Sequence, residues 1–594
     1  MKLAMNNQNP DSNYPKKVEP VIRLVKILTE EKENLFVFLI YAVIISILYL
    51  AIPLGAQILV NTIAAGVLIQ PLIIISTVVL LGLFFLGVLK LLQIYIGEII
   101  QRKIFVKIAL GMARTIPLVH QKHFGKIYAP ELINRFFDTV TLQKNLNLIL
   151  LEVPAAALQI LVGIILMAFY SPILMVFDSL MLVSIFALSM LGYKGLETSI
   201  EESSTKYKIA HWLEELARCQ ISFKMNGFPG YSEAVTDSKN LDYLDRRKAH
   251  FRVLLRQFSA SYIIQALGTA GVLSIGGWLV INGQLSLGQL VASELIIIMI
   301  LSALDKIIQK LESWYDLLTA IDKVNYINLL DTERTNGIKA KLDGQGAEIT
   351  CEDIVFGYTP ERKIFNKLNL HLEHGSRTSL VGVSGAGKTT LAHLITGLYD
   401  THEGSIMFNG SPITSLMLND LRKNIALVSD FNEIFSGTVE ENILLGRSYL
   451  SEDDLRRVID LVELERDLKQ YPNGLQTLLL SEGRNISLGQ RQRILLARSI
   501  INNPQLLILD EAFGGMDEMT KLKIIEKLFE KSQPWTILNI THDAEVVAKT
   551  DYIYLLEKGL VREQGPLNDL ISNSESQFCK LFPELTRIKQ KEMI

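Results

Sequence analysis

The stretch GVSGAGKTT, residues 382 to 390, begins within the apolar run SLVGV at 379–383 and continues it. It matches the pattern GxxxxGK[ST], which ends here at Lys388 and Thr389. Small residues are needed in this pattern because backbone amides must wrap closely around phosphate groups, and the start of a helix adds positive potential. Lys388 is then placed to neutralise the β- and γ-phosphates, and the Thr389 hydroxyl to bind Mg²⁺. The stretch therefore predicts a phosphate-binding loop between a strand and a helix.

A second motif, QLLILDE at 505–511, reads as a buried strand that ends in two acids. Taken alone, it is more typical of a core strand followed by surface carboxylates. After a phosphate-binding loop, however, Asp510 is placed to hold the Mg²⁺ shell and Glu511 to polarise an attacking water as general base. From about residue 346 short apolar runs alternate with helical segments, which indicates an α/β sheet.

The first half of the 594-residue chain has a different character, because its apolar residues concentrate before residue 305 and the segment 34–89 carries no charge. About 20 apolar residues span a hydrocarbon core of roughly 30 Å. Six stretches qualify: about 35–55, 71–97, 148–169, 172–193, 258–281 and 286–304. The second and third, and the fourth and fifth, are joined by long charged connections that read as helices continuing into water.

Basic residues indicate the orientation of these spans. The turns at 56–70, 170–171 and 282–285 contain no lysine or arginine, whereas the N-terminal segment and the two long connections are rich in them. Both termini are therefore expected in the cytoplasm. Residues 1–33 lack the features of a removable signal peptide, and the helix VIRLVKIL within them could lie along the membrane interface or be a soluble amphipathic turn.

The net charge of −3 argues against nucleic acid as the main partner, since polyanion binders usually carry a basic excess. The three cysteines have neither disulfide-framework nor zinc-site spacing.

Three carboxylates fall inside the predicted spans: Glu152, Asp178 and Glu294. A charge at such depth is costly and tends to face a wet cavity or a partner. For Asp178 and Glu152 a local interhelical hydrogen bond is the simpler interpretation. Glu294, flanked by apolar residues without a nearby cation, is the stronger candidate for a transport pathway, with Asp178 second. A pathway lined by Glu294 would favour cationic or hydrogen-bond-donating substrates.

A family becomes visible once further motifs are added: ISLGQRQR at 486–493, GGMD at 514–517 and NITHD with His542. Their order and spacing resemble those of the ATP-binding cassette. With six preceding spans, the chain resembles a half-transporter of the type I ATP-binding cassette (ABC) exporter class. The resemblance implies a membrane α-helical bundle of six transmembrane helices fused to an α/β P-loop nucleotide-binding domain. The expected boundaries are 1–33 for a cytoplasmic segment with a possible interfacial helix, 34–310 for the transmembrane domain, 311–344 for a helical extension and linker, and 345–594 for the cassette.

The resemblance also implies roles for individual residues. Glu511, His542 and Lys388 would be catalytic, and Thr389 and Asp510 would hold Mg²⁺. The expected ATP-binding residues are Tyr358, Gly382, Ser384, Gly385, Ala386, Gly387, Lys388, Thr389, Thr390, Asp430, Ser487, Gly489, Gln490 and Asp517. Among them Tyr358 would stack on adenine, and Ser487 and Gly489 would reach the γ-phosphate bound by the opposite subunit.

Two positions depart from the family pattern. Leu488 replaces the first glycine of the usual LSGGQ signature, and activity is expected to survive because Ser487 and Gly489 remain. Asp430 stands where a glutamine is usual. A carboxylate there can accept hydrogen bonds from the water shell of Mg²⁺, but it adds negative charge near the phosphates. We therefore expect Asp430 to weaken metal–nucleotide binding or to alter how ATP binding is relayed to the membrane half.

The predicted function is ATP-driven export of an amphipathic small molecule or peptide by alternating access, from a cell membrane of bacterial inner-membrane type. A single cassette must pair, and the presence of Glu511 and Ser487 in one chain favours a homodimer over a heterodimer. Segments 118–130 and 203–214 would dock on the cassettes. One alternative is a lipid or lipid-linked flippase. The other is an ATP-gated channel or regulatory subunit, and the intact Glu511 argues against this second alternative. Membrane lipids and an unidentified exported substrate are the remaining expected partners.

Overall fold

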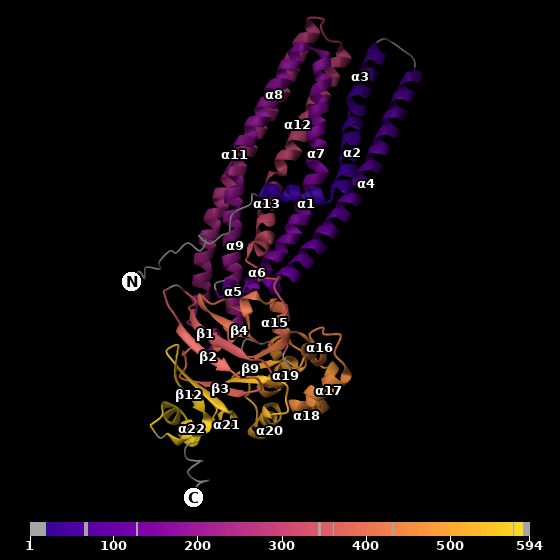
Figure 1. Cartoon of the computed structure of the whole chain (residues 1–594). Coiled ribbons are helices and arrows are strands. Elements are labelled where there is room, and N and C mark those ends of the chain that lie inside the picture. The colour runs from indigo at the N-terminus through magenta and orange to yellow at the C-terminus, as the bar shows by residue number, and fades with distance from the viewer. Residues whose placement is uncertain are drawn as a thin grey trace, which may run out of the picture. The chain divides into compact units, whose positions relative to one another are not determined.

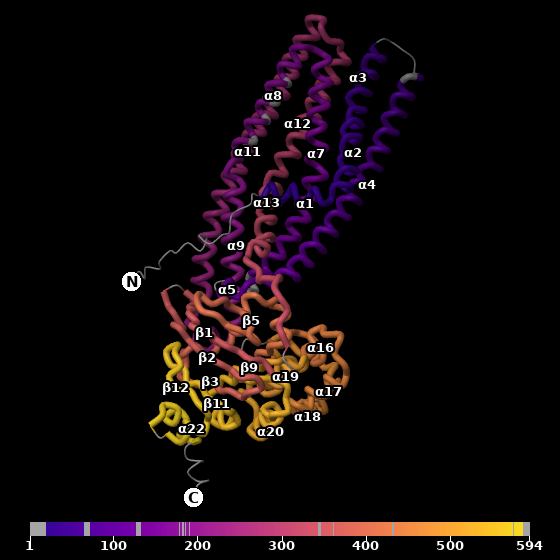
Figure 2. Tube along the Cα trace, viewed as in Figure 1, coloured from indigo at the N-terminus to yellow at the C-terminus, as the bar shows by residue number. Residues whose placement is uncertain are grey.

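The structure is a computed structural model that describes residues 20–64, 69–125, 129–342, 346–359, 361–429, 433–573 and 575–585. Its contacts divide the chain into two compact units, which we call the membrane unit and the cassette unit. The membrane unit comprises Met1–Val119 and Lys126–Asp331, and the cassette unit comprises His120–Gly125 and Thr332–Ile594. The trace can be followed by residue number in Figure 2.

Long helices that run side by side make up most of the membrane unit (Figure 1). They are α2 (Lys32–Leu48), α3 (Ala51–Ala64), α4 (Ile69–Thr115), α7 (Asp138–Tyr170), α8 (Pro172–Met190), α11 (Tyr231–Ile281) and α12 (Leu287–Gln309). Helices occupy all six predicted spans. Within the described residues, five helical stretches are long and apolar enough to cross a membrane: Lys32–Ala64, Leu72–Leu118, Leu132–Tyr170, Tyr231–Ile281 and Leu287–Leu329. The chain is therefore a multi-pass membrane protein.

Helix α7 lies at the centre of this bundle, where it packs against α2, α4, α8, α12 and α13 (Leu311–Asn325). The close approach of α7 to α12 depends on Gly163, because a Cβ atom added there would lie 2.8 Å from Ile300. Ile160, Ile296 and Ile300 are buried in the same apolar cluster. Packing of small and branched residues thus holds the helices together where lipid provides no hydrophobic driving force.

Shorter helices complete the membrane unit. They are α1 (Pro20–Glu30), α6 (Ala129–Asn134), α9 (Gly195–Arg218), α10 (Gln220–Asn226), and the 3₁₀ helices η2 (Ile116–Leu118), η3 (Arg135–Phe137) and η4 (Tyr326–Leu329). In α1, Leu24 is buried and packs in a cluster with residues of α13, whereas Ile22 and Val25 are exposed. An exposed apolar face of this kind is compatible with the predicted interfacial helix, which stays a prediction.

The division into units differs from the predicted linker at 311–344. Helix α13 belongs to the membrane unit because Leu317, Leu318 and Ile321 are buried in the cluster that α7 helps to form. The segment that follows it, from Thr332 onward, belongs to the cassette unit.

The cassette unit is built on two main sheets. The first has the strand order β2-β1-β4-β5, with β1 (Ile349–Phe356), β2 (Phe365–Leu372), β4 (Glu403–Phe408) and β5 (Ser411–Pro412), all paired antiparallel. The second has the order β12-β11-β3-β10-β9-β6, with β3 (Arg377–Val381), β6 (Ile425–Val428), β9 (Leu506–Asp510), β10 (Thr536–Ile540), β11 (Tyr552–Glu557) and β12 (Leu560–Pro566). Within the second sheet only the pairing of β11 with β12 is antiparallel. A small ladder joins β7 (Gly437–Thr438) to β8 (Leu478–Leu479).

Helices cover both faces of the parallel strands. They are α14 (Lys388–Ile395), α15 (Leu418–Asn424), α16 (Val439–Leu444), α17 (Glu452–Leu461), α18 (Glu465–Gln470), α19 (Leu488–Ile500), α20 (Glu518–Phe529), α21 (Ala544–Val547), α22 (Leu567–Ser572) and α23 (Gln577–Leu581). Along β10, Ile537 belongs to one apolar cluster while Leu538 and Ile540 belong to another. Burial on both faces explains why such strands are continuous apolar runs rather than alternating ones. Together the two units give a membrane helical bundle joined to an α/β nucleotide-binding fold, as the sequence predicts.

Candidate nucleotide-binding site

The predicted phosphate loop and two other motifs meet at one edge of the parallel sheet. In the register of that sheet, Ile540 at the end of β10 pairs with Leu380 of β3 and with Asp510 of β9. The loop after β3, the acids at the end of β9 and His542 after β10 therefore emerge side by side. Ligands of open α/β sheets bind outside the carboxyl ends of their strands, so this edge is the expected position of a site.

Glycine is required at both ends of the phosphate loop. Gly382 has φ 149°, and a Cβ atom there would lie 2.1 Å from the carbonyl oxygen of Leu556. Gly387 has φ 105° as the residue that caps α14, and its Cβ would lie 2.8 Å from the ring of Phe365. Between them Ser384 and Gly385 are exposed and Ala386 is buried, so the loop presents backbone to solvent.

Lys388, the first residue of α14, is buried with 8% of its surface exposed. Its Nζ donates to the carbonyl oxygens of Gly382 at 2.8 Å and Val383 at 3.2 Å, and lies 3.3 Å from Nε2 of His542. Burial lowers the pKa of Lys388, while the negative charges of Glu511 and Asp510 act in the opposite direction. Desolvation and, second, the charge of Lys388 lower the pKa of His542, which favours a neutral imidazole at pH 7.

The two acids of β9 have different environments. Asp510 is buried at the end of the strand, with 7% of its surface exposed. Glu511 is exposed and has φ 51°, a left-handed backbone conformation, and its N–H donates to the Ile540 carbonyl oxygen at 3.0 Å. A non-glycine residue in this conformation costs about 1–3 kcal/mol and is concentrated at functional sites. The Asp510 side chain is therefore enclosed by the protein, whereas Glu511 is accessible to solvent water.

Tyr358 lies beside the phosphate loop in an aromatic cluster. Its hydroxyl oxygen is 3.2 Å from Oγ1 of Thr390, and its ring packs edge-to-face on Phe356 and Tyr399 at centroid distances of 5.2 Å each. Half of the Tyr358 surface remains exposed, at 50%. The exposed part of the ring is suited to stack on a nucleotide base.

The predicted signature residues form a second group, held by α19 and α20. Ser487 caps α19: its Oγ accepts from the Gln490 N–H at 3.2 Å, and its own N–H donates to Oε1 of Gln490 at 2.9 Å. Gly489 is buried, and a Cβ there would lie 2.8 Å from the Gly515 carbonyl oxygen. Asp517 caps α20 by accepting from the Thr520 N–H at 3.0 Å, a hydrogen bond that lowers the pKa of Asp517.

The residue types of the first group fit ATP with Mg²⁺. A glycine-bounded loop and a buried lysine suit the phosphates, while the Thr389 hydroxyl and the Asp510 carboxylate are oxygen donors of the kind that Mg²⁺ takes together with phosphate oxygens. In the part of the chain that the structure describes, no group of three His, Cys, Asp or Glu residues could hold a metal ion. The expected Mg²⁺ would therefore depend on the nucleotide for its remaining ligands.

Other predicted residues lie elsewhere. Asp430 and the side chain of Asp178 fall outside the described residues. Leu488 is exposed beside Ser487, with 54% of its surface accessible. Glu294 is half-buried on α12, and Glu152 forms an ion pair with Lys310 at 3.5 Å, as the local interpretation of that carboxylate expects. The predicted span 71–97 also contains a cation, Lys90, which the carboxylate pattern of the spans does not identify.

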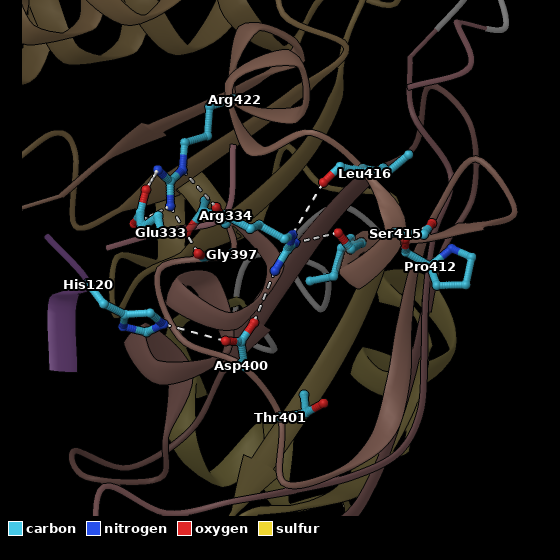
Figure 3. A network of polar contacts seen from close by, with 12 residues as sticks. His120, Glu333, Arg334, Gly397, Asp400, Thr401, Pro412, Ser415, Leu416 and Arg422 are labelled. Atoms are coloured by element: carbon cyan, nitrogen blue, oxygen red, sulfur yellow. Dashed lines mark hydrogen bonds and ion pairs between the residues drawn. The ribbon is translucent and has the colours of Figure 1, made fainter. Parts of the chain in front are cut away.

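A polar network that sequence reasoning did not find joins three segments of the cassette unit (Figure 3). His120 Nε2 lies 3.4 Å from Oδ2 of Asp400, and Arg334 Nη1 lies 3.3 Å from Oδ1 of the same carboxylate. Beside them Arg422 pairs with Glu333 through contacts of 2.5 and 2.9 Å. The hydrogen bond with His120 is the main cause that lowers the pKa of Asp400, with Arg334 contributing. The helix α5 (Gln121–Phe124) and the start of the cassette sequence are thus held at one point.

Comparison with known proteins identifies relatives of the cassette unit and a solved structure with a similar fold. Residues 365–514 match the family model described as ABC transporter. An uncharacterized ABC transporter ATP-binding protein, YwjA of Bacillus subtilis, is 33% identical over 324 residues, which are 54% of this chain and 56% of that protein. The transport/processing ATP-binding protein ComA of Streptococcus pneumoniae is 30% identical over 338 residues, 57% of this chain and 47% of that protein. The chain therefore spans about half the length of the curated relatives it matches.

Among solved structures, a bacterial Atm1-family ABC exporter with ATP bound superposes with a TM-score of 0.82 at 20% identity, covering 94% of this chain and 98% of that chain. At this level of identity the likeness concerns the fold, and it extends over both units of the chain. Within the cassette unit, residues 365–514 match the ABC transporter model, and the chain as a whole has the fold of the ABC exporter that superposes on it.

Proposed function

We propose that this chain, with its ABC transporter ATP-binding domain in an exporter fold, is one half of an ATP-driven exporter of an amphipathic small molecule or peptide. The observation that carries the proposal is the separation of the site residues into two groups. Lys388, Asp510 and Glu511 gather at the carboxyl edge of the sheet, whereas Ser487 and Gly489 belong to the α19–α20 group. A second copy would bring its α19–α20 group to the phosphate loop of the first.

A homodimer is the simplest assembly that completes the site. One chain supplies both Glu511 and Ser487, so two copies would form two equivalent hydrolytic sites. The capping hydrogen bonds of Ser487 support this role, because its Oγ is used as an acceptor and its hydroxyl hydrogen remains available to a phosphate oxygen.

Each residue at the strand edge has a distinct task in this proposal. When ATP binds, Lys388 donates to phosphate oxygens instead of the carbonyl oxygens of Gly382 and Val383. The neutral imidazole of His542 donates its one N–H to the γ-phosphate. Glu511 orients the attacking water and takes its proton. Bound Mg²⁺, held by Thr389 and Asp510, would neutralise charge on the phosphates.

The cassette would act on the membrane unit through α5. The segment His120–Gly125 interrupts the sequence of the membrane unit but belongs by its contacts to the cassette unit. Movement of the cassette therefore pulls on the chain at Val119 and Lys126. The second predicted docking segment, 203–214, lies within α9 of the membrane unit. Binding of ATP would shift the population toward one orientation of the membrane helices, and hydrolysis would reset it.

The test is ATP hydrolysis by the full chain in nanodiscs. The wild type is expected to hydrolyse ATP as a dimer, and Glu511→Gln to bind ATP while losing at least about a hundredfold in rate, since general-base catalysis contributes roughly 10²–10⁴-fold. Ser487→Ala should lose hydrolysis without losing nucleotide binding to the monomer. A monomer that hydrolyses ATP at the dimer's rate, or an obligate different subunit in the purified complex, would refute the proposal.

A lipid or lipid-linked flippase is the second candidate within the same fold, and two lysines that line a cavity of the membrane unit favour it. Stimulation of ATP hydrolysis by a lipid, but not by water-soluble peptides, would select this candidate. An ATP-gated channel or regulatory subunit is disfavoured by the intact Glu511, and very slow hydrolysis by the wild type would restore it.

A further inference from the structure

A cavity of about 340 Å³ opens between α2, α4, α7 and α12 of the membrane unit. Six polar side chains line it: Tyr49, Lys90, Gln93, Glu152, Gln159 and Lys306. A cluster of six polar side chains is unusual among helices that are otherwise apolar enough to span a membrane, because intramembrane polar groups are costly and commonly mark a pathway or binding site.

Two lysines converge on one tyrosine in this cavity. Lys90 Nζ donates to the Tyr49 hydroxyl at 2.5 Å and lies 5.1 Å from the centroid of its ring. Lys306 Nζ lies 5.8 Å from the same centroid. The tyrosine therefore holds two ammonium groups near one another, at distances where the ring quadrupole partly offsets their repulsion.

The charges in the cavity are not balanced. Glu152 is paired with Lys310 at 3.5 Å, so the nearest carboxylate is already engaged by a third cation. Asp305, next to Lys306, accepts from Gln309 at 2.6 Å and from Gln265 at 3.4 Å. Within the described residues neither Lys90 nor Lys306 forms an ion pair with a carboxylate. Two unneutralised ammonium groups at a cavity wall attract an anion.

The two lysines lie at the same level of the bundle. Lys90 is about 30 Å along α4 from Ile69, and Lys306 is about 30 Å along α12 from Leu287, at 1.5 Å per residue. Both helices start at the same side, and a hydrocarbon core is about 30 Å thick. The ammonium groups therefore lie at the level where a head group meets the apolar interior, with Lys90 near the middle of α4 and Lys306 close to the end of α12.

We propose that Lys90, Lys306 and Tyr49 form a binding site for the anionic head group, phosphate or carboxylate, of an apolar molecule that this chain transports. The inference deepens the proposed function and rests on it for the transport step. The ammonium groups bind the head group. Gln159, a residue with 3% of its surface exposed, borders the head group, and the apolar tail extends among the surrounding helices. Lys306 also lines a neighbouring cavity of about 670 Å³ with Gln265, Thr269 and Asp305, which offers room for a larger polar head.

The proposal reverses the preference expected from Glu294. A pathway lined by that carboxylate favours cationic substrates, whereas the lysine pair selects anions. A simpler explanation is that both lysines only extend their ammonium groups toward the interface, as long basic side chains near helix ends do. The two explanations differ in whether an anion binds, which an experiment can measure.

The test uses the full chain in nanodiscs of phosphatidylcholine. Three probes are titrated, namely dodecyl phosphate, dodecyltrimethylammonium and inorganic phosphate, with ATP hydrolysis as one readout. Retention of phosphatidylglycerol, doped into the same nanodiscs and detected by native mass spectrometry, is the second readout and needs no hydrolysis. The variants are Lys90→Gln, Lys306→Gln, the double substitution, and Lys306→Arg, which keeps the charge. Lys144→Gln, an exposed lysine of α7 that does not line the cavity, is the matched control.

Dodecyl phosphate is expected to stimulate the wild type, with a half-saturating concentration that rises at least about tenfold in the double variant and little in Lys306→Arg or Lys144→Gln, because only the double substitution removes both ammonium groups that bind the charged head group. Inorganic phosphate is expected to have no effect, which separates an amphipathic ligand from a free anion. Retention of phosphatidylglycerol that depends on both lysines, without a response to dodecyl phosphate, assigns the site to membrane lipid and still supports it.

Equal binding of both anionic amphiphiles by the wild type and the double variant would overturn the proposal, as would equal stimulation by dodecyltrimethylammonium. A wild type that hydrolyses no ATP yet retains phosphatidylglycerol through the lysines would refute the proposed function while leaving the binding site intact.

Discussion

Replacing Asp400 with asparagine removes the one carboxylate that His120 and Arg334 share. Arg334 keeps two other acceptors, the carbonyl oxygens of Ile413 at 2.6 Å and Leu416 at 3.3 Å, so the start of the cassette sequence stays attached. Among the described residues, the His120 side chain then keeps one hydrogen bond, its weak cap of α5, in which Nδ1 accepts from the Lys122 N–H at 3.4 Å. The substitution should therefore loosen α5 far more than the segment around Arg334.

The size of the effect follows from exposure. Asp400 has 55% of its side-chain surface exposed, against 17% for His120 and 24% for Arg334. Partly exposed ion pairs contribute about 0.2–1 kcal/mol each, so the pair of contacts is worth about 1 kcal/mol. That corresponds to a decrease in cassette Tm of about 2–4 °C for a domain of this size, which is too little to unfold it.

If α5 transmits cassette closure, Asp400→Asn should reduce the coupling free energy between ATP binding and the orientation of the membrane helices by the same amount, about 1 kcal/mol. The equilibrium constant between the two orientations of the membrane helices at saturating ATP should then fall about fivefold, with unchanged nucleotide affinity. The assay attaches spin labels to Lys144→Cys in a Cys219→Ser background and measures the label-to-label distance distribution of the proposed dimer with and without ATP. The other two cysteines, Cys351 and Cys579, are buried.

Asp569→Asn, on the exposed surface of α22, is the matched control. The reasoning fails if Asp400→Asn responds to ATP like the wild type, or if the control loses as much. The pH dependence gives a further check. Because His120 and Arg334 lower the pKa of Asp400, its contribution is present above the unfolded pKa of about 3.9 and is lost as pH falls through the folded pKa. The difference in Tm between wild type and variant should therefore disappear only in acid, below about pH 4.

Three further predictions concern the nucleotide site. Lys388→Met should weaken ATP binding by about tenfold to a hundredfold, measured by calorimetry. Yet it should leave the nucleotide-free Tm at pH 7 unchanged or raised: burial lowers the pKa of Lys388, so its charge destabilises the fold until pH rises through the folded pKa toward about 10.4. Tyr358→Ala should lose about tenfold in ATP affinity while Tyr358→Phe retains it, since stacking on a base is worth about 1–3 kcal/mol; equal losses would assign the effect to the hydroxyl contact with Thr390. Asp430→Gln should lower the Mg²⁺ concentration that half-saturates ATP hydrolysis or change the spin-label response to ATP, and an unchanged value of both would contradict the role given to Asp430.

Local patterns indicate those parts of the candidate site that one segment forms by itself. The glycines of the phosphate loop and the acids after β9 are identified by their own neighbours in sequence, and Ser487 with Gln490 has the spacing of a capping box. Placing Lys388 within 3.3 Å of His542 requires the order of β3, β10 and β9, which no local pattern contains.

The contacts that sequence reasoning missed share a physical cause. His120 and Asp400 are 280 residues apart, and neither stands in a motif. Tyr49, Lys90 and Lys306 come from three different helical segments, and each taken alone is typical of a residue near the end of a span. The unit boundary at Asp331 depends on which side α13 packs against, and the apolar spacing of α13 does not identify its partner.

The assignment of six residues, His120–Gly125, to the cassette unit has a consequence for exchanging domains between relatives. A chimaera joined only near Thr332 would combine the cassette of a relative with the α5 of this chain. The residue of the relative that corresponds to Asp400 would then face His120 of this chain instead of its own α5 segment. Transplanting α5 together with the cassette keeps that contact intact and places two further junctions on either side of His120–Gly125. The cassette unit is therefore discontinuous in sequence, because it includes a short stretch that lies within the sequence of the membrane unit.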